Sequence, residues 1–240
     1  MNPRRRTVGS FVVLFLAGMA FILFWRDIST GKEKQGIPSS FRQVFEFNGT
    51  LWSGLFRPEA RNECAPPPRG KPARVNGSIG LQKNIPLSQW TLRVDEDPSD
   101  STAKHLSLKF EDLEKLPRTE ISVRFYCIEG WSEGMSFAGV KFSDFVKAYH
   151  LKTKPYVGLE SVDRKYYVSL DLKSMMHDQT LLAYEQNGEP LTPRHGAPLR
   201  LAVPTKYGIK NIKQIGRIFF SDRRPPDYWA ERGYDWHAGL

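Results

Sequence analysis

The longest apolar run in the chain lies at its beginning. Residues 8–25 contain no charged side chain, and their only polar residue is Ser10. Eighteen apolar residues approach the roughly 20 that a helix needs to cross a hydrocarbon core of about 30 Å. Three arginines, Arg4 to Arg6, precede the run, and the positive-inside rule places such a flank in the cytoplasm. We therefore predict that residues 1–26 form an uncleaved anchor, in contact with lipid through residues 8–25.

Two alternatives concern this segment. A cleaved signal peptide would need a shorter apolar core followed by a small-x-small site, and the sequence after Trp25 is Arg-Asp-Ile-Ser-Thr-Gly. The pair Arg5-Arg6 also loosely resembles a twin-arginine signal, which serves export of proteins already folded around a cofactor. The arginines either form such a signal or only set the topology.

The next segment has a different composition. Residues 27–72 contain Gly31-Lys-Glu-Lys-Gln-Gly36 and the proline-rich stretch 66–72, which favours an extended, semi-rigid chain. Aromatic residues between positions 41 and 56 are frequent enough to pack on the domain or on the membrane surface. We expect residues 27–72 to form a stalk and peripheral segment.

Residues 73–240 read as one domain of short elements. Alternating or compact apolar runs bounded by turn residues are typical of strands, and helical spacing with a capping serine predicts a helix at residues 143–149. The strands expected are residues 90–94, 106–110, 121–127, 165–170, 181–187, 199–203 and 215–221. Further short helices are expected at residues 111–116 and 172–178. The pattern predicts an α+β domain built mainly on mixed, largely antiparallel sheet.

Charge narrows the range of partners. The 240 residues carry a net charge of +9, of which +3 falls in the first 30 residues. A basic surface suits nucleic acid, anionic lipid or an anionic ligand. No sequence signature of a nucleic-acid-binding fold is present, so we predict no nucleic-acid partner.

Two cysteines are too few for a disulfide framework. Cys64 lies in a proline-rich loop and looks incidental. Cys127 ends an apolar strand, and a Glu-Gly turn follows it. A thiol at that position can serve as a ligand to a soft metal or as a nucleophile. The alternative for Cys127 is a small buried core residue.

The sequence around Cys127 resembles the molybdenum-cofactor domain of the sulfite oxidase family. The resemblance rests on five stretches: Cys127-Ile-Glu-Gly-Trp-Ser132, Ala138-Gly-Val-Lys-Phe-Ser-Asp144, Leu181-Leu-Ala-Tyr-Glu-Gln-Asn-Gly-Glu-Pro-Leu191, His195-Gly-Ala-Pro-Leu-Arg200 and Lys206-Tyr-Gly-Ile-Lys-Asn-Ile-Lys213. A terminal Tyr228-Trp-Ala-Glu-Arg-Gly-Tyr-Asp-Trp236 completes it. Residues 73–240 are most similar to bacterial members without haem, such as catalytic subunits of periplasmic methionine sulfoxide reductases.

The resemblance implies a set of roles. Cys127 is expected to bind molybdenum, and the molybdopterin is expected to contact Asn76, Ser161, His195, Arg200, Asn211, Ile212 and Lys213. Within this set, residues 211–213 hold the cofactor phosphate. Lys206 and Lys210 add positive charge or form a solvated basic face, and Tyr207 faces substrate or packs in the core. Phe137 stands where relatives often have Trp, which leaves the substrate open.

The resemblance implies a membrane-anchored molybdenum oxidoreductase, with its catalytic domain on the periplasmic side of the inner membrane. Its reaction would be oxygen-atom transfer or coupled electron and proton transfer on a sulfoxide- or sulfite-like substrate. The chain has no Cys-x-x-Cys-His haem motif, so electrons would pass through a separate, haem-containing membrane partner. A non-catalytic extracytoplasmic binding module and a cysteine hydrolase remain as alternatives, the latter needing a base beside Cys127.

Overall fold

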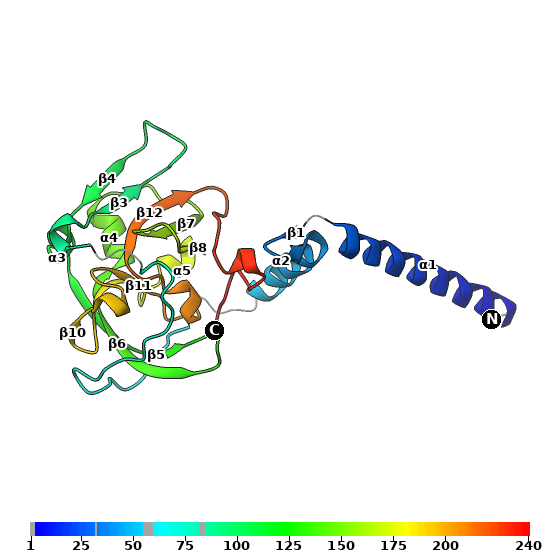
Figure 1. The fold of residues 1–240 in the computed structure, drawn as a ribbon, viewed down its shortest axis with the longest axis horizontal. Coiled ribbons are helices and arrows are strands. Elements are labelled where there is room, and N and C mark those ends of the chain that lie inside the picture. Colours follow the sequence, from blue (N-terminus) through cyan, green and yellow to red (C-terminus); the bar gives the residue numbers. More distant parts are fainter. Residues whose placement is uncertain (1–2, 32, 55–59, 82–84) are drawn as a thin grey trace.

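The N-terminal apolar run is a single helix that stands apart from the folded domain (Figure 1). The structure, a computed structural model, describes residues 3–31, 33–54, 60–81 and 85–240. Helix α1 spans Pro3–Thr30. Its segment Val8–Thr30 is long and apolar enough to cross a membrane, and none of it is buried. The helix continues beyond residue 26, and the predicted anchor boundary there stays a prediction.

The segment expected to be a stalk contains a helix. Strands β1 (Glu33–Lys34) and β2 (Ile37–Pro38) form a small hairpin, and helix α2 (Ser39–Ser53) follows it. Apolar residues at positions 41, 44, 45, 47 and 51 repeat with helical spacing, and no proline interrupts them. Figure 1 shows α2 between α1 and the domain.

Residues 60–72 form neither helix nor strand, turn at Arg69–Gly70 and lie against the domain. The Asn62 side chain accepts from the Arg124 N–H at 3.0 Å and donates to the Arg124 carbonyl at 2.8 Å. Farther along, the Cys64 N–H donates to the Ser122 carbonyl, and the Gly70 N–H donates to the Asn187 carbonyl. The bonds of Asn62 and Cys64 satisfy backbone groups along the outer edge of strand β5 (Arg118–Tyr126), which would otherwise be an open sheet edge.

Two five-stranded sheets make up the domain. One has the order β4 (His105–Leu108), β3 (Leu92–Asp95), β12 (Ile215–Ser221), β7 (Tyr156–Ser161) and β8 (Tyr167–Asp171). In this sheet β12 runs parallel to β3, and the other pairs are antiparallel. The other has the order β10 (Glu189–Pro190), β9 (Leu181–Gln186), β6 (Ser132–Lys141) and β5, with β11 (Arg200–Ala202) also paired to β9. The domain is therefore the α+β, sheet-dominated type that the sequence predicts.

Helices are short and lie between strands. They are α3 (Phe110–Glu114), α4 (Phe142–Ala148) and α5 (Leu172–Met175), with 3-10 turns at Leu87–Gln89, Pro193–His195, Gly208–Lys210 and Ala230–Arg232. The predicted cap of α4 was wrong, because the helix starts at Phe142 and Ser143 lies in its first turn. The Phe142 N–H donates to the Thr180 carbonyl, so contact with a distant turn sets that start.

Sequence patterns do not predict strands β6 and β7. Both contain glycine and serine, which have low strand propensity. Pairing with neighbours on both sides holds β6 in place, between β5 and β9. At Gly139 an added Cβ would lie 2.1 Å from the Leu182 carbonyl oxygen, so the close approach of β6 to β9 requires glycine.

The main hydrophobic core contains residues from both sheets, including Leu92, Val140, Phe142, Leu159 and Phe220. A buried ion pair lies at its margin, where Lys210 Nζ is 2.5 Å from Asp227 Oδ2. Asp227 Oδ2 also accepts from the Ser169 N–H. Burial by itself lowers the pKa of Lys210, and the nearby Asp227 carboxylate opposes that shift. The pair joins β8, the turn Gly208–Lys210 and the C-terminal segment.

Replacing Lys210 alone should destabilise the fold. In Lys210→Ala the Asp227 carboxylate stays buried without its cation, and such a break costs about 3–5 kcal/mol. The free energy of unfolding, measured by urea denaturation, should fall accordingly. The double variant Lys210→Met/Asp227→Leu, which removes both charges, should recover much of the loss. Equal destabilisation by the two variants would contradict this account.

Candidate functional site

A cavity of about 200 Å³ opens beside the β5–β6 hairpin loop. Five parts of the chain line it, namely residues 76–79, the end of β5 with the hairpin loop, Tyr166 before β8, the region 200–213 and the C-terminal segment. Its polar and sulfur-bearing lining residues are Asn76, Cys127, Glu129, Arg200, Asn211 and Lys213, and its aromatic ones are Phe125, Trp131, Tyr166, Trp229 and Tyr234. Five of the eight predicted site residues are thus brought to one cavity: Asn76, Cys127, Arg200, Asn211 and Lys213.

Cys127 follows the last residue of β5 and begins the hairpin loop, as predicted. Its N–H donates to the Trp131 carbonyl at 2.9 Å, and the Gly130 N–H donates back to the Cys127 carbonyl at 3.1 Å. Gly130 has φ +88°, a conformation that favours glycine and permits this tight return. The thiol is largely buried, and it lines the cavity.

Asn76 connects the thiol to the hairpin loop. Its Nδ2 lies 3.4 Å from Cys127 Sγ and 3.1 Å from Glu129 Oε2. Glu129 also accepts from Trp131 Nε1 at 3.1 Å. The hydrogen bonds from Trp131 and Asn76 lower the pKa of Glu129. The Glu129 carboxylate thus holds the Asn76 amide in place, and the Asn76 N–H group points toward the Cys127 sulfur.

Arg200 is a buried cation beside this group, only 4% exposed. Its Nη1 donates to the His195 carbonyl at 3.2 Å, and its guanidinium lies 5.1 Å from the centre of the Phe137 ring. Burial lowers the pKa of Arg200 to about 10. Arg200 Nε is buried and has no hydrogen-bond partner within the described residues, and such a donor is costly unless a ligand or solvent satisfies it.

Lys213 is the second cation of the cavity. Its Nζ donates to three carbonyl oxygens, those of Asn76 at 2.7 Å, Arg194 at 3.0 Å and Gly77 at 3.2 Å. Burial lowers the pKa of Lys213 to about 8, and the positive charge of Arg200 adds to that shift. Over residues 60–81 and 85–240, neither Lys213 nor Arg200 forms an ion pair with a carboxylate. Two adjacent cations without counter-ions suit an anionic ligand.

His195 and Asn211 have their polar atoms engaged by the protein. His195 Nδ1 lies 2.8 Å from Thr192 Oγ1, and Nε2 lies 3.2 Å from the Ala73 carbonyl oxygen. Burial lowers the pKa of His195. Asn211 Oδ1 accepts from the Val203 N–H at 2.8 Å. His195 is absent from the cavity lining, whereas Asn211 belongs to it.

Two other predicted contacts, Ser161 and Ile212, lie behind the cavity wall. Ser161 Oγ donates to Asp163 Oδ1 and accepts from the Tyr166 N–H, and the Tyr166 residue lines the cavity in its place. Ile212 is buried, and its carbonyl accepts from the Leu201 N–H. In this structure both residues support the wall.

The prediction of a solvated basic face was wrong for Lys206 and Lys210, because both are buried. Lys210 pairs with Asp227, and Lys206 Nζ lies 3.6 Å from Asp171 Oδ2. Lys206 and Tyr207 line a separate cavity of about 900 Å³. Neither Lys206 nor Lys210 lines the cavity that contains Cys127.

Sequence reasoning assigned no role to Trp229 and Tyr234. Their rings are 5.0 Å apart in an edge-to-face arrangement, and both line the cavity. The signal was present in the C-terminal motif quoted for the family resemblance. Between Trp229 and Tyr234 lies the 3-10 turn Ala230–Arg232, which ends at Gly233 with φ +90°.

Similar proteins of known family show which family this chain belongs to. Residues 79–229 match the family model described as the oxidoreductase molybdopterin binding domain. The chain belongs to this family. Over 215 residues it is 32% identical to a putative protein-methionine-sulfoxide reductase subunit, YedZ1, of Azospira oryzae, covering 86% of this chain and 79% of that protein. The expected enzyme class, a molybdopterin-dependent oxidoreductase, and the expected cofactor are thereby confirmed.

This chain spans a smaller share of the other relatives. The protein-methionine-sulfoxide reductase catalytic subunit MsrP of Campylobacter jejuni is 32% identical over 68% of this chain, which spans 60% of that protein. The crystal structure of the sulfane dehydrogenase SoxCD from Paracoccus pantotrophus superposes with a TM-score of 0.51 at 24% identity, over 59% of this chain and 40% of that one. This structural likeness confirms the expected fold.

Gly196 controls how closely the turn at His195 approaches Lys213. It has φ +102°, and an added Cβ would lie 2.7 Å from Lys213 Cβ and 3.0 Å from its Cα. In Gly196→Ala the turn must move, so we expect a loss of unfolding free energy beyond the roughly 1–2 kcal/mol of a left-handed alanine. Cofactor content of the purified protein should fall as well.

Gly130→Ala is the matched control for this change. Gly130 also has positive φ, and nothing lies within 4 Å of its added Cβ. It should show the conformational cost alone in thermal or urea unfolding. Equal destabilisation by the two variants would contradict the steric role of Gly196.

Proposed function

We propose that this protein is a membrane-anchored molybdopterin enzyme that reduces a sulfoxide, with Cys127 as the protein ligand to molybdenum. The observation that carries the proposal is the placement of one thiol and two unpaired cations around a single cavity. The names of the relatives, which are methionine-sulfoxide reductase subunits, favour a sulfoxide over a sulfite-like substrate.

The residues present fit the cofactor. A pterin dithiolene with a terminal phosphate is anionic, and Arg200 Nε is a buried donor that lacks a partner within the described chain. Arg200 and Lys213 would bind the anionic groups, while Asn211 would hold the adjacent turn. The bound cofactor supplies a metal centre that exchanges an oxygen atom and two electrons.

The chain's own residues orient and protect this centre. Cys127 offers a soft thiolate, and the Asn76 amide at 3.4 Å limits where the sulfur lies. Within the described residues, no three His, Cys, Asp or Glu side chains gather into another metal site. We infer that Cys127 is the sole protein ligand, and that His195 positions the turn through its two ring contacts.

Aromatic side chains give the cavity a surface suited to the substrate. Trp131, Trp229 and Tyr234 line it, and the thioether of methionine, the product of the reaction, makes favourable contacts with aromatic rings. Tyr234 is partly exposed, so it lies where a substrate would enter. We propose that a methionine sulfoxide, free or on a protein surface, enters past these rings.

Electrons would come from a separate protein. The sequence contains no haem-attachment motif, and we propose a haem-containing membrane partner. Helix α1 would place the enzyme beside that partner, with its domain on the periplasmic side of the inner membrane. The positive charge of Arg4 to Arg6 on the opposite flank supports this orientation.

The hydrolase alternative finds no support at Cys127. The thiol's hydrogen-bonding neighbour is the amide of Asn76, and the ring nitrogens of His195 contact Thr192 and Ala73. A non-catalytic module would not need two buried cations beside a thiol.

Metal analysis of the purified protein, together with reduction of methionine sulfoxide by reduced viologen, tests the proposal. One molybdenum per chain with turnover is the expected result, and a metal-free active protein would refute it.

Replacing Cys127 should abolish turnover. Cys127→Ala removes the proposed metal ligand, and Cys127→Ser offers a harder oxygen in its place. Cofactor content should persist in part, because Arg200 and Lys213 remain. Cys64→Ser is the control, since Cys64 lies outside the cavity lining. Viologen-linked turnover and molybdenum content distinguish the cases, and full activity in Cys127→Ala would overturn the assignment.

Replacing either cation should lower cofactor occupancy. Arg200→Ala and Lys213→Ala each remove a charge-assisted contact, worth about 1.5–3 kcal/mol. Lys147→Ala, which removes an exposed lysine on α4, should leave occupancy unchanged. Pterin fluorescence after release from the protein measures occupancy. Unchanged occupancy in both cavity variants would refute the assignment.

The same lysine predicts a pH dependence. Burial lowers the pKa of Lys213 to about 8. The amine is therefore charged below pH 8 and neutral above it. Uptake of the anionic cofactor by the apo-protein should weaken as pH rises through about 8. Uptake that strengthened over that interval would have the wrong sign.

A further inference from the structure

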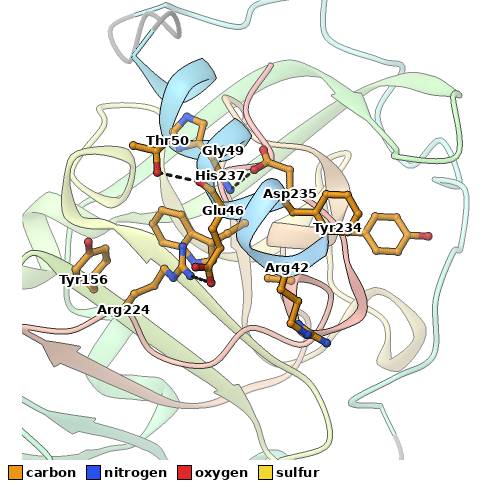
Figure 2. Close-up of a pocket in the computed structure, with 12 residues that line it drawn as sticks. Arg42, Glu46, Gly49, Thr50, Tyr156, Arg224, Tyr234, Asp235 and His237 are labelled. Carbon is orange, nitrogen blue, oxygen red and sulfur yellow. Dashed lines mark hydrogen bonds and ion pairs between the residues drawn. The ribbon is translucent and has the colours of Figure 1, made fainter. Parts of the chain in front are cut away.

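Helix α2 has two distinct faces. Figure 2 shows Arg42, Glu46 and Gly49 of α2 beside the C-terminal segment, around a cavity of about 290 Å³. Arg42 donates to the Glu231 carbonyl, and Glu46 lies 2.9 Å from Arg224. An added Cβ on Gly49 would lie 3.1 Å from Asp235. Both charged residues of α2, Arg42 and Glu46, thus bind the domain.

The opposite face is apolar and exposed. Val44, Phe47 and Leu51 follow the spacing i, i+3, i+7, which aligns them along one side of a helix. They are 46%, 68% and 55% exposed. At 100° per residue this stripe lies about half a turn from the centre of the face that holds Arg42, Glu46 and Gly49. An apolar stripe in water is unfavourable unless something covers it.

The neighbouring helix indicates what covers the stripe. Phe24 near the end of the apolar run and Phe41 in the first turn of α2 meet edge to face, with ring centres 6.1 Å apart. Trp25 and Arg26 follow Phe24, and such residues mark the boundary between hydrocarbon and headgroups. The first turn of α2 therefore lies level with that boundary.

We propose that α2 is an interfacial helix, whose Val44, Phe47 and Leu51 insert into the outer surface of the bilayer. An amphipathic helix with an uncharged apolar side and its charges turned away binds a membrane in this way. Because α2 also holds the C-terminal segment, including the neighbourhood of Tyr234, the bilayer would fix the orientation of the cavity entrance. The inference rests on the proposed membrane anchor.

Site-specific photocrosslinking of the full chain tests this inference. Benzoylphenylalanine replaces Phe47 or Leu51, and the protein is reconstituted in vesicles of phosphatidylethanolamine and phosphatidylglycerol. Mass spectrometry after illumination identifies the adducts. We expect lipid adducts at both positions. Intrachain products alone, or covalent dimers of this chain, would overturn the proposal in favour of a domain contact or a second copy.

Crosslinking at further positions distinguishes a failure of this inference from a failure of the proposed membrane anchor. Phe45 is the comparison on the same helix, because it lines the cavity beside the C-terminal segment although it is 42% exposed, and it should give far fewer lipid adducts than Phe47. Ser101, in the exposed loop after β3, should give none either. Phe15 in α1 should give lipid adducts. Their absence at Phe15 would refute the anchor and this inference with it, whereas adducts at Phe15 without adducts at positions 47 and 51 would refute the inference alone.

Discussion

The arrangement of the residues around the cavity depends on the hydrogen bonds of the Lys213 ammonium group. Its three hydrogen bonds join the segment 76–77, the turn at Arg194 and the chain after Asn211. The same segment 76–77 carries the amide that faces Cys127, so the position of the thiol's neighbour follows from the position of this amine. Gly196 lets the turn approach closely enough for the contact.

Two buried cations without carboxylate partners have an energetic cost. A buried cation normally has a carboxylate partner, as Lys210 has Asp227 and Lys206 has Asp171. Lys213 and Arg200 have carbonyl partners instead, and burial lowers the pKa of each. The lysines that have carboxylate partners thus lie outside the lining of the Cys127 cavity, whereas the two cations without such partners line it, which suits an anionic ligand.

The fold explains why the thiol is both accessible and fixed. Cys127 begins a hairpin loop, so its side chain can face a cavity, while the bond from its N–H to the Trp131 carbonyl holds its backbone. The edge of β5 that precedes it is covered by residues 60–72. A segment that resembles a linker in composition is therefore part of the structure that supports the site.

Local pattern alone determined much of this protein. The apolar run of α1, the sheet-dominated domain, the strand that ends at Cys127 and the turn after it are all short-range features of residue order. The resemblance indicated Cys127, Arg200 and Lys213 as a group.

Tertiary structure decided the remaining features, because they depend on contacts between residues that are distant in sequence. Strands β6 and β7 form because they pair with neighbouring strands. Lys206 and Lys210 are buried where carboxylates distant in sequence pair with them, and Ser161 and Ile212 lie behind the cavity wall. Trp229 and Tyr234 reach the cavity only when the C-terminal segment folds back. Charge, burial and cavity lining are properties of that assembled neighbourhood, and sequence spacing does not encode them directly.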